Sequence, residues 1–386
     1  MGGTPYTRRS LTDAQKLGCL GHRIPIEFLP AAYTSQVSDL EKEQVHSHLR
    51  VVLKADRNLE TMVTTSPSEP VLSEAAYFMM TTQAQFNPPE ALHGILNGFA
   101  VNKGELGELI VALLFIMARD EVVGVADHLG RPPNNERWCS LPGLLTSLFC
   151  APSAASNDDD SIITSEAWHF TAESPNQTES SLAKAFEHSK VYFTHFIKVH
   201  EYTVVHVKYL MYLMARGAAV LCANGHPAVD GIIPFLVEGD EIRLDNIGII
   251  MFQVKNDTKC YSLRRNLFDA MDPRSLGILE SDNIPVIRIV FALAEKTPSI
   301  ELGRYTTSTT VGSYTTYDFW VSGLSSKVLV PVRKDPNAWD NLLQISSPWQ
   351  RIYSDRLKLR TTHRRSMNPG AAADSEFWGN WCKLDS

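Results

Sequence analysis

The feature that most constrains the fold is a helix that is apolar on most of its faces. Residues Gly104 to Asp120 read GELGELIVALLFIMARD and carry the strongest helical pattern in the chain. A helix of this kind is not stable on a surface, because some apolar side chains would face water whichever way it turned. The chain is therefore expected to fold around it, and its 386 residues can bury one large core or two modest ones.

Later segments of the chain have the composition of β-strands. They are Ala218 to Ala223, Val229 to Val237, Ile247 to Lys255 and Ile284 to Leu293. Long helical material is predicted from Ser181 to Arg216, ended by Gly217 in the position of a helix C-cap, and a short helical stretch precedes the fourth strand. The order helix, three strands, helix, strand predicts a mixed α/β fold.

The remaining segments suggest how the chain is divided. Residues 1–70 are polar and broken by Pro and Gly, with one predicted helix over Ser38 to Ala55, and are interpreted as an N-terminal appendage. Residues 71–335 are expected to form the α/β domain, with an insertion at about 121–200 that includes a flexible Ser/Asp/Asn-rich loop at 151–182. Residues 336–386 are expected to form a C-terminal extension with a cationic run, Arg351 to Arg365. The Thr/Tyr-rich segment Thr306 to Trp320 fits either an edge strand or a loop.

Composition and charge narrow the functional classes. The apolar share of 44% and the charged share of 20% are those of an ordinary globular protein. The six cysteines form no CxxC pair, so neither a zinc knuckle nor a disulfide framework is indicated, and an intracellular location, nuclear or cytoplasmic, is expected. No secretory signal is found, and the longest apolar run is about half of what a bilayer requires. The net charge of −7 means that any nucleic-acid contact needs a local basic face or a metal ion.

The candidate functional side chains lie at the polar end of one predicted strand. In IGIIMFQVKN, alternate residues share one face, and that face is apolar until its last two members, Gln253 and Lys255. A buried amide and a buried ammonium need partners, because leaving either unpaired costs several kcal/mol. The nearest candidate partner is Asp230, in the preceding strand.

These residues resemble the signature of the PD-(D/E)xK nuclease superfamily, in which an Asp on one strand and an (E/Q)xK tripeptide on the next meet at one edge of a sheet. The matching elements are Pro227 to Asp230, with two residues between them where the signature has none, and Gln253-Val254-Lys255, the QxK variant. The sequence around them also resembles that of a multi-copy group of fungal proteins related to the nuclease-like part of Crinkler-type proteins. The resemblance implies a restriction-endonuclease-like core, a mixed central sheet flanked by helices, with large helical insertions.

The resemblance also implies a metal-dependent endodeoxyribonuclease that hydrolyses DNA phosphodiesters. Mg²⁺ or Mn²⁺ is the expected cofactor, since phosphodiester hydrolysis uses a hard cation with oxygen ligands. Asp230 would be the principal ligand, with the Gln253 side-chain oxygen and the Val254 carbonyl, and Lys255 would orient or deprotonate the attacking water. Because Gln replaces a carboxylate, metal binding is expected to be weaker, and the activity weakened or lost.

The superfamily usually adds a Glu from a helix before the first strand. Glu108 is the first choice and Glu105 the second, since both precede the apolar run of the predicted helix. Glu201 is a rival, because its predicted helix leads directly into the strand at Ala218. If Glu108 is the right residue, residues 121–200 form an insertion.

Simpler interpretations stand beside the nuclease hypothesis. Asp230-Gly231 is also an ordinary hairpin-turn signal, and Lys255-Asn256-Asp257 is also the polar end of a strand entering a loop. A non-catalytic module that binds nucleic acid or protein on the same fold is the main alternative, and an interaction protein of unrelated α/β fold is a third. A protein partner or a homo-oligomer is left open.

Overall fold

The structure is a computed structural model. It describes residues 11–28, 35–55, 57, 62–83, 86–96, 103–128, 137–150, 182–223, 226, 228–256, 264–279, 284–308 and 313–345. Three sequence-based predictions lie outside these residues: the flexible loop 151–182 except for its last residue, the cationic run 351–365, and the role of Pro227.

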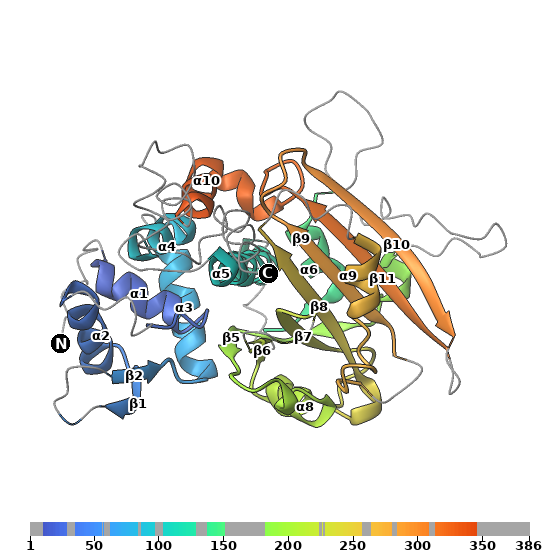
Figure 1. The fold of residues 1–386 in the computed structure, drawn as a ribbon, viewed down its shortest axis with the longest axis horizontal. Coiled ribbons are helices and arrows are strands. Elements are labelled where there is room, and N and C mark those ends of the chain that lie inside the picture. Colours follow the sequence, from blue (N-terminus) through green and yellow to red (C-terminus); the bar gives the residue numbers. More distant parts are fainter. Residues whose placement is uncertain are drawn as a thin grey trace, which may run out of the picture.

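A nine-stranded mixed sheet forms the centre of the molecule (Figure 1). Its main path runs β10-β11-β9-β8-β7-β4-β3, and β6 pairs with both β7 and β5. β7 is antiparallel to β6 and β8, whereas β9 is parallel to β8 and β11. The strands are β3 Cys139–Ser140, β4 Lys190–Val191, β5 His195–Lys198, β6 Ala218–Leu221, β7 Gly231–Leu236, β8 Ile247–Lys255, β9 Val286–Ala292, β10 Ser299–Ser308 and β11 Ser313–Ser322. The predicted mixed α/β class is confirmed.

Two apolar layers cover the two faces of this sheet. Along β8, Ile250 and Phe252 join the larger core, while Ile249 and Met251 join the smaller one, as alternation along a strand requires. The larger core holds side chains of α1 (Asp13–Gly21), α4 (Pro88–Leu96), α5 (Lys103–His128), α6 (Leu141–Leu148) and α10 (Pro336–Gln344). The smaller core holds side chains of α8 (Val207–Ala215) and α9 (Arg264–Ala270).

Helix α5 is the predicted apolar helix, and it is buried as expected. Its Phe115 ring lies 5.4 Å from the ring of Phe252 and 6.0 Å from that of Phe291, centroid to centroid. Because β8 and β9 carry those two rings, α5 packs directly on the middle of the sheet. The described helices include none that is long and apolar enough to cross a membrane.

Two predicted helices are wrong in part. The segment from Ser181 to Arg216 holds α7 (Leu182–Ala185), β4, β5 and a 3₁₀ helix, Tyr202–Val204, before α8 begins. Phe193 and Phe196 are buried there against the core, and β5 pairs with β6, so tertiary packing overrides the helical pattern. The helix expected to Ala55 is α2, Ser35–Ser47, which is followed by Leu49 at a φ of 57° and then by β1, Val51–Ala55. The end of α8 before Gly217 is confirmed.

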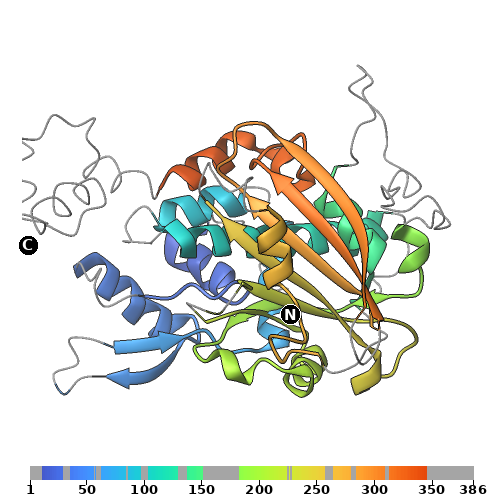
Figure 2. The same ribbon diagram turned by 45° about the vertical axis from the view of Figure 1, so that its right-hand side comes forward.

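The described residues between 11 and 96 lie against the body of the molecule. They form α1, α2, β1, β2 (Met62–Thr65), α3 (Pro70–Thr82) and α4, and the β1–β2 pair makes a small sheet of its own (Figure 2). The remaining described elements are the 3₁₀ helices Leu244–Asn246 and Val330–Lys334.

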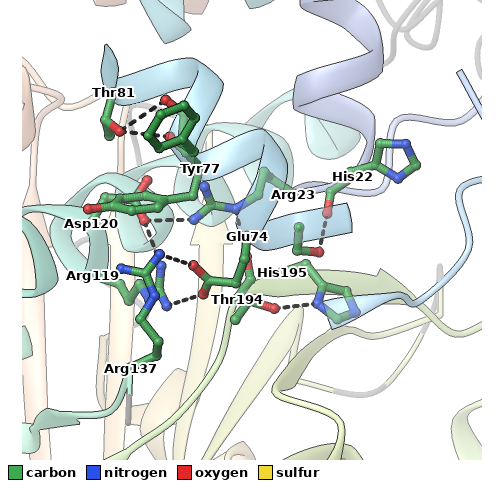
Figure 3. Close-up of polar contacts among 12 residues, drawn as sticks. His22, Arg23, Glu74, Tyr77, Thr81, Arg119, Asp120, Arg137, Thr194 and His195 are labelled. Atoms are coloured by element: carbon green, nitrogen blue, oxygen red, sulfur yellow. Dashed lines mark hydrogen bonds and ion pairs between the residues drawn. The ribbon is translucent and has the colours of Figure 1, made fainter. Parts of the chain in front are cut away.

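A buried ion network joins this N-terminal region to α5 and the sheet (Figure 3). The Arg23 guanidinium donates to Asp120 Oδ1 at 2.7 Å and to the carbonyl oxygen of Thr194 at 2.6 Å. Arg119 pairs with Glu74 at 2.5 Å, and the guanidinium carbons of Arg23, Arg119 and Arg137 lie 5.8, 5.4 and 4.6 Å from the centroid of the Tyr77 ring. Removing one member would leave a buried charge uncompensated, so the network fixes α3 relative to α5.

Candidate metal site

Asp230 is held by hydrogen bonds to the strands on both sides. Its backbone N–H donates to the carbonyl of Phe252 at 2.9 Å, and its carbonyl accepts from the N–H of Cys222 at 2.9 Å. The next residue, Gly231, is the first residue of β7 and pairs with Phe252 in the antiparallel register. One step back along the same register places Asp230 opposite Gln253. Asp230-Gly231 is thus the start of a strand and not the centre of a two-residue hairpin turn.

Glycine at position 231 has a packing reason. A β-carbon there would lie 2.1 Å from the nearest ring atom of Phe252, so any larger residue would force the ring away. This close approach explains the sequence Asp-Gly without turn chemistry.

The Asp230 carboxylate points along the edge of the sheet toward β8. Its Oδ2 accepts from the backbone N–H of Val254 at 2.6 Å, and within the described part of the chain Oδ1 makes no hydrogen bond. Burial raises the pKa of Asp230, while the Val254 hydrogen bond and the charges of Lys255, Lys198 and His226 lower it. The charges of Lys255, at the end of β8, and of Lys198, at the end of β5, therefore both act on this carboxylate.

Gln253 and Lys255 lie at the polar end of β8, as predicted. Gln253 is only 6% exposed, and its side-chain oxygen Oε1 is buried with no hydrogen-bond partner in the described residues. An unpaired buried acceptor is unfavourable, and it calls for a donor or a cation that the described residues do not supply. Lys255 is half-buried and lies opposite Ala292 of β9.

Glu108 reaches the same edge from the N-terminal turns of α5. The helix approaches β8 so closely that a β-carbon at Gly107 would lie 2.5 Å from Asn256 Nδ2 and 2.9 Å from Val254 Cγ1. Burial raises the pKa of Glu108, an ion pair with Lys198 lowers it, and the charges of Asp230 and Glu105 raise it further. Glu108 is thus close enough for Asp230 to affect its ionisation.

Lys198 is the residue that the sequence analysis missed. It ends β5, its side chain is only 8% exposed, and its Nζ lies 2.7 Å from Glu108 Oε2. Its charge also lowers the pKa of Asp230. The sequence analysis missed Lys198 because it predicted a helix over Ser181 to Arg216 and therefore did not place this lysine at the end of a strand. The signal that could have found it is the same as at Lys255, a lysine ending a short apolar run.

The structure gives the two alternatives to Glu108, Glu201 and Glu105, different surroundings. Glu201 is exposed, accepts a hydrogen bond from Thr203 Oγ1 at 2.7 Å, and precedes a 3₁₀ helix, so the helix expected to carry it toward β6 does not exist there. Glu105 is half-buried on the first turn of α5, near Glu108. Glu108 is the helix carboxylate on which the charge of Asp230 acts.

The candidate site draws on two groups of side chains: Asp230, Gln253 and Lys255 lie where β7 begins and β8 ends, and the Glu108–Lys198 pair lies on the larger-core side of the sheet. Among the described residues there is no group of three or more His, Cys, Asp or Glu side chains that could hold a metal ion. A site built only from such side chains is therefore not present in that part of the chain. Mg²⁺ needs less, because it is commonly held by one or two carboxylates together with carbonyl oxygens and waters.

The chain was also compared with known proteins. No family model matches it, and neither a curated protein nor a solved structure matches it.

Proposed function

We propose that the protein is a divergent metal-dependent nuclease, or a weakened descendant of one, with a restriction-endonuclease-like core of the PD-(D/E)xK type. The observation that carries the proposal is the buried, unpaired oxygen of Gln253 opposite Asp230 on the adjacent antiparallel strand. The element order supports it, with α5, which carries Glu108, as the first helix, residues 121–200 as an insertion, and then β6, β7, β8, α9 and β9.

The residues present fit a hard divalent cation. Asp230 offers Oδ1, Gln253 offers the oxygen that lacks a donor, and Val254 offers its carbonyl, all at the edge where β7 begins and β8 ends. Mg²⁺ or Mn²⁺ accepts such oxygen ligands, and when bound it polarises a phosphoryl oxygen and lowers the pKa of a bound water.

Groups of the protein itself would hold the ligands in place and assist the attacking water. The Val254 N–H fixes the Asp230 carboxylate through Oδ2, so the other oxygen is held in one direction before any ligand arrives. Lys255 would orient the attacking water or take its proton, and its charge would offset the charge that builds on the phosphate. Glu108 would join as a further ligand when it leaves Lys198.

A second candidate function is favoured by the Glu108–Lys198 pair. Two lysines balance the two carboxylates, and Lys198 occupies an oxygen of Glu108. Such a site attracts a divalent ion weakly. A non-catalytic module that binds nucleic acid or protein on the same fold is therefore the alternative.

One experiment separates the two functions. Plasmid DNA is incubated with the protein and Mg²⁺ or Mn²⁺, beside Asp230→Ala and Lys255→Ala. A nuclease loses cleavage in both variants while keeping its far-ultraviolet circular dichroism. Cleavage retained in both variants would refute the assignment. No cleavage by the wild type, together with DNA binding in a gel-shift assay, would favour the module.

A further inference from the structure

Three neighbouring strands of the sheet end beside the candidate metal site. Strands β8, β9 and β11 run parallel to one another, so their carboxyl ends lie at one edge of the sheet (Figure 1). The register places Lys255, which ends β8, opposite Ala292 of β9, and Ala292 opposite Ser322, which ends β11. In open α/β sheets, ligands bind outside the carboxyl ends of the strands. The residues that follow β9 and β11 therefore continue the edge at which the candidate metal site lies.

Two loops continue from these strand ends, and backbone hydrogen bonds join them to β8 and to each other. The first loop is residues 293–298 and the second is residues 323–329. The N–H of Leu293 donates to the carbonyl of Lys255 at 3.0 Å, and the N–H of Leu324 donates to the carbonyl of Leu293 at 3.2 Å. Both loops are thus fixed in a row that starts at the last residue of β8.

The two loops and the 3₁₀ helix that follows carry more cations than carboxylates. Residues 293–298 and 323–334 contain one carboxylate, Glu295, and four cationic side chains: Lys296, Lys327, Arg333 and Lys334. Lys334 is paired with Glu121 at 2.8 Å. The other three cations are exposed and form no ion pair with the described residues. In a chain with a net charge of −7, they form the local basic face that contact with nucleic acid needs.

Arg333 is held against the loop that carries Lys327. Its Nε donates to the carbonyl of Ser326 at 3.3 Å, and Ser326 is the residue before Lys327. The loop is itself closed by the N–H of Val328, which donates to the carbonyl of Ser325 at 3.1 Å. A guanidinium that is exposed and already held in place loses less side-chain entropy when it binds an anion. Arg333 and Lys327 therefore present their charges from the same loop.

The spacing of the strand ends suits a nucleic-acid backbone. Neighbouring strands lie about 4.8 Å apart, so the ends of β8 and β11, two strands apart, are separated by about 10 Å. Each strand of B-DNA carries one phosphate about every 3.4 Å along the helix axis, so about three phosphates fit this span. Lysine and arginine neutralise such phosphates and position the duplex without reading its sequence.

We propose that Lys296, Lys327 and Arg333 form a basic strip that binds the phosphate backbone of a DNA duplex and directs it to the candidate metal site. The identity of the partner rests on the proposed function, because the strip continues the edge at which a phosphodiester would be cut. Binding to the strip itself needs no metal ion. Each phosphate contact releases counterions, so each strip residue contributes to the salt dependence of DNA binding.

The test is DNA binding by the full chain in EDTA, measured by fluorescence anisotropy of a labelled duplex at several salt concentrations. Wild type is compared with Lys296→Gln, Lys327→Gln and Arg333→Gln, each checked for folding by circular dichroism. Lys54→Gln is the matched control, because Lys54 is also exposed and without an ion pair in the described residues, but belongs to the separate β1–β2 sheet. Asp230→Ala tests the metal site separately. Poly-L-glutamate, in place of DNA, is the second probe.

We expect saturable DNA binding by the wild type that weakens as salt is added. Each strip variant should bind about five- to tenfold more weakly at about 0.1 M salt, and its plot of log affinity against log salt should be shallower by about 0.9. Lys54→Gln should stay within about twofold of wild type, with the same slope. No DNA binding by the folded wild type, or an unchanged slope in all three strip variants, would overturn the proposal. Poly-L-glutamate that binds as tightly as DNA would also overturn it, because the partner would then be an acidic polypeptide.

Failure of the strip and failure of the proposed nuclease give different results. DNA binding that weakens in the strip variants, with no cleavage by the wild type, would refute the nuclease and support the strip. Cleavage that is lost in Asp230→Ala, with DNA binding in EDTA unchanged in the strip variants, would support the nuclease and overturn the strip.

Discussion

Asp230 Oδ2 accepts the backbone N–H of Val254 at 2.6 Å, so a side chain continues the hydrogen bonding of β8 past the first residue of β7. The same carboxylate is thereby both a structural group and the principal candidate ligand. The two roles separate by substitution. Asp230→Ala leaves the Val254 N–H without its acceptor, and we expect the free energy of unfolding to fall by about 1–3 kcal/mol in urea titrations. Asp230→Asn keeps an acceptor and should lose less. Equal losses in the two variants would argue against the bond as a stabilising contact.

Glu108 and Lys198 form a largely buried pair, with side-chain exposures of 15% and 8%. Replacing one partner leaves the other charge uncompensated, so Glu108→Gln or Lys198→Met alone should cost about 3–5 kcal/mol of unfolding free energy. The double variant should recover most of this loss, because no buried charge remains. Wild type, the two single variants and the double variant form a double-mutant cycle, and chemical denaturation of the four proteins measures the coupling free energy between Glu108 and Lys198. Additive losses would mean that the two side chains do not depend on each other.

We predict that Gln253 lowers the free energy of unfolding of the metal-free protein, because its side chain suits ligand binding better than it suits the buried position. Its buried Oε1 lacks a partner in the described residues, so Gln253→Leu removes an unsatisfied group at nearly constant volume. We expect the free energy of unfolding to rise by about 1–3 kcal/mol in the metal-free protein, measured by urea denaturation. A drop in stability would mean that the amide already has a good partner in the folded chain.

His195 makes stability depend on pH. Its folded-state pKa of about 3 lies below the ordinary value of 6.5. Below pH 6.5 the unfolded chain binds a proton that the folded chain does not, so the free energy of unfolding falls as pH falls toward 3. The slope from this group is at most about 1.4 kcal/mol per pH unit. His195→Gln should lose that slope between pH 6.5 and 5, measured by urea denaturation at each pH. Parallel stability curves for the two proteins would contradict the assignment.

Sequence patterns predicted the elements whose signal is local and strong. The bounds of β8, Ile247–Lys255, were predicted to the residue, and α5 was predicted because an apolar run of that length fits only a buried helix. The segment 181–216 failed because its aromatic residues fit either a helix or a strand, and pairing of β5 with β6 decides between them. Such pairing is a long-range contact that a local pattern does not contain.

In the candidate site, too, the residues with a local sequence signal were predicted and the residue that depends on long-range strand pairing was not. Gln253 and Lys255 stand out because they are polar at the end of an apolar strand, and Glu108 because it precedes the apolar run of α5. Lys198 depends on β5, so its place beside Glu108 could not be foreseen once that segment was taken for a helix. The division into appendage, domain and extension stays a prediction.

Titration of Mn²⁺ into the wild type, Asp230→Ala and Lys255→Met tests the central claim most directly. The account predicts saturable Mn²⁺ binding by the wild type, loss of saturable binding in Asp230→Ala, and binding at least as tight as wild type in Lys255→Met, because that change removes a nearby positive charge. Folding of each variant is checked by circular dichroism. Mn²⁺ binding that is equal in wild type and folded Asp230→Ala, or absent from the wild type, would contradict a metal site at the edge shared by β7 and β8.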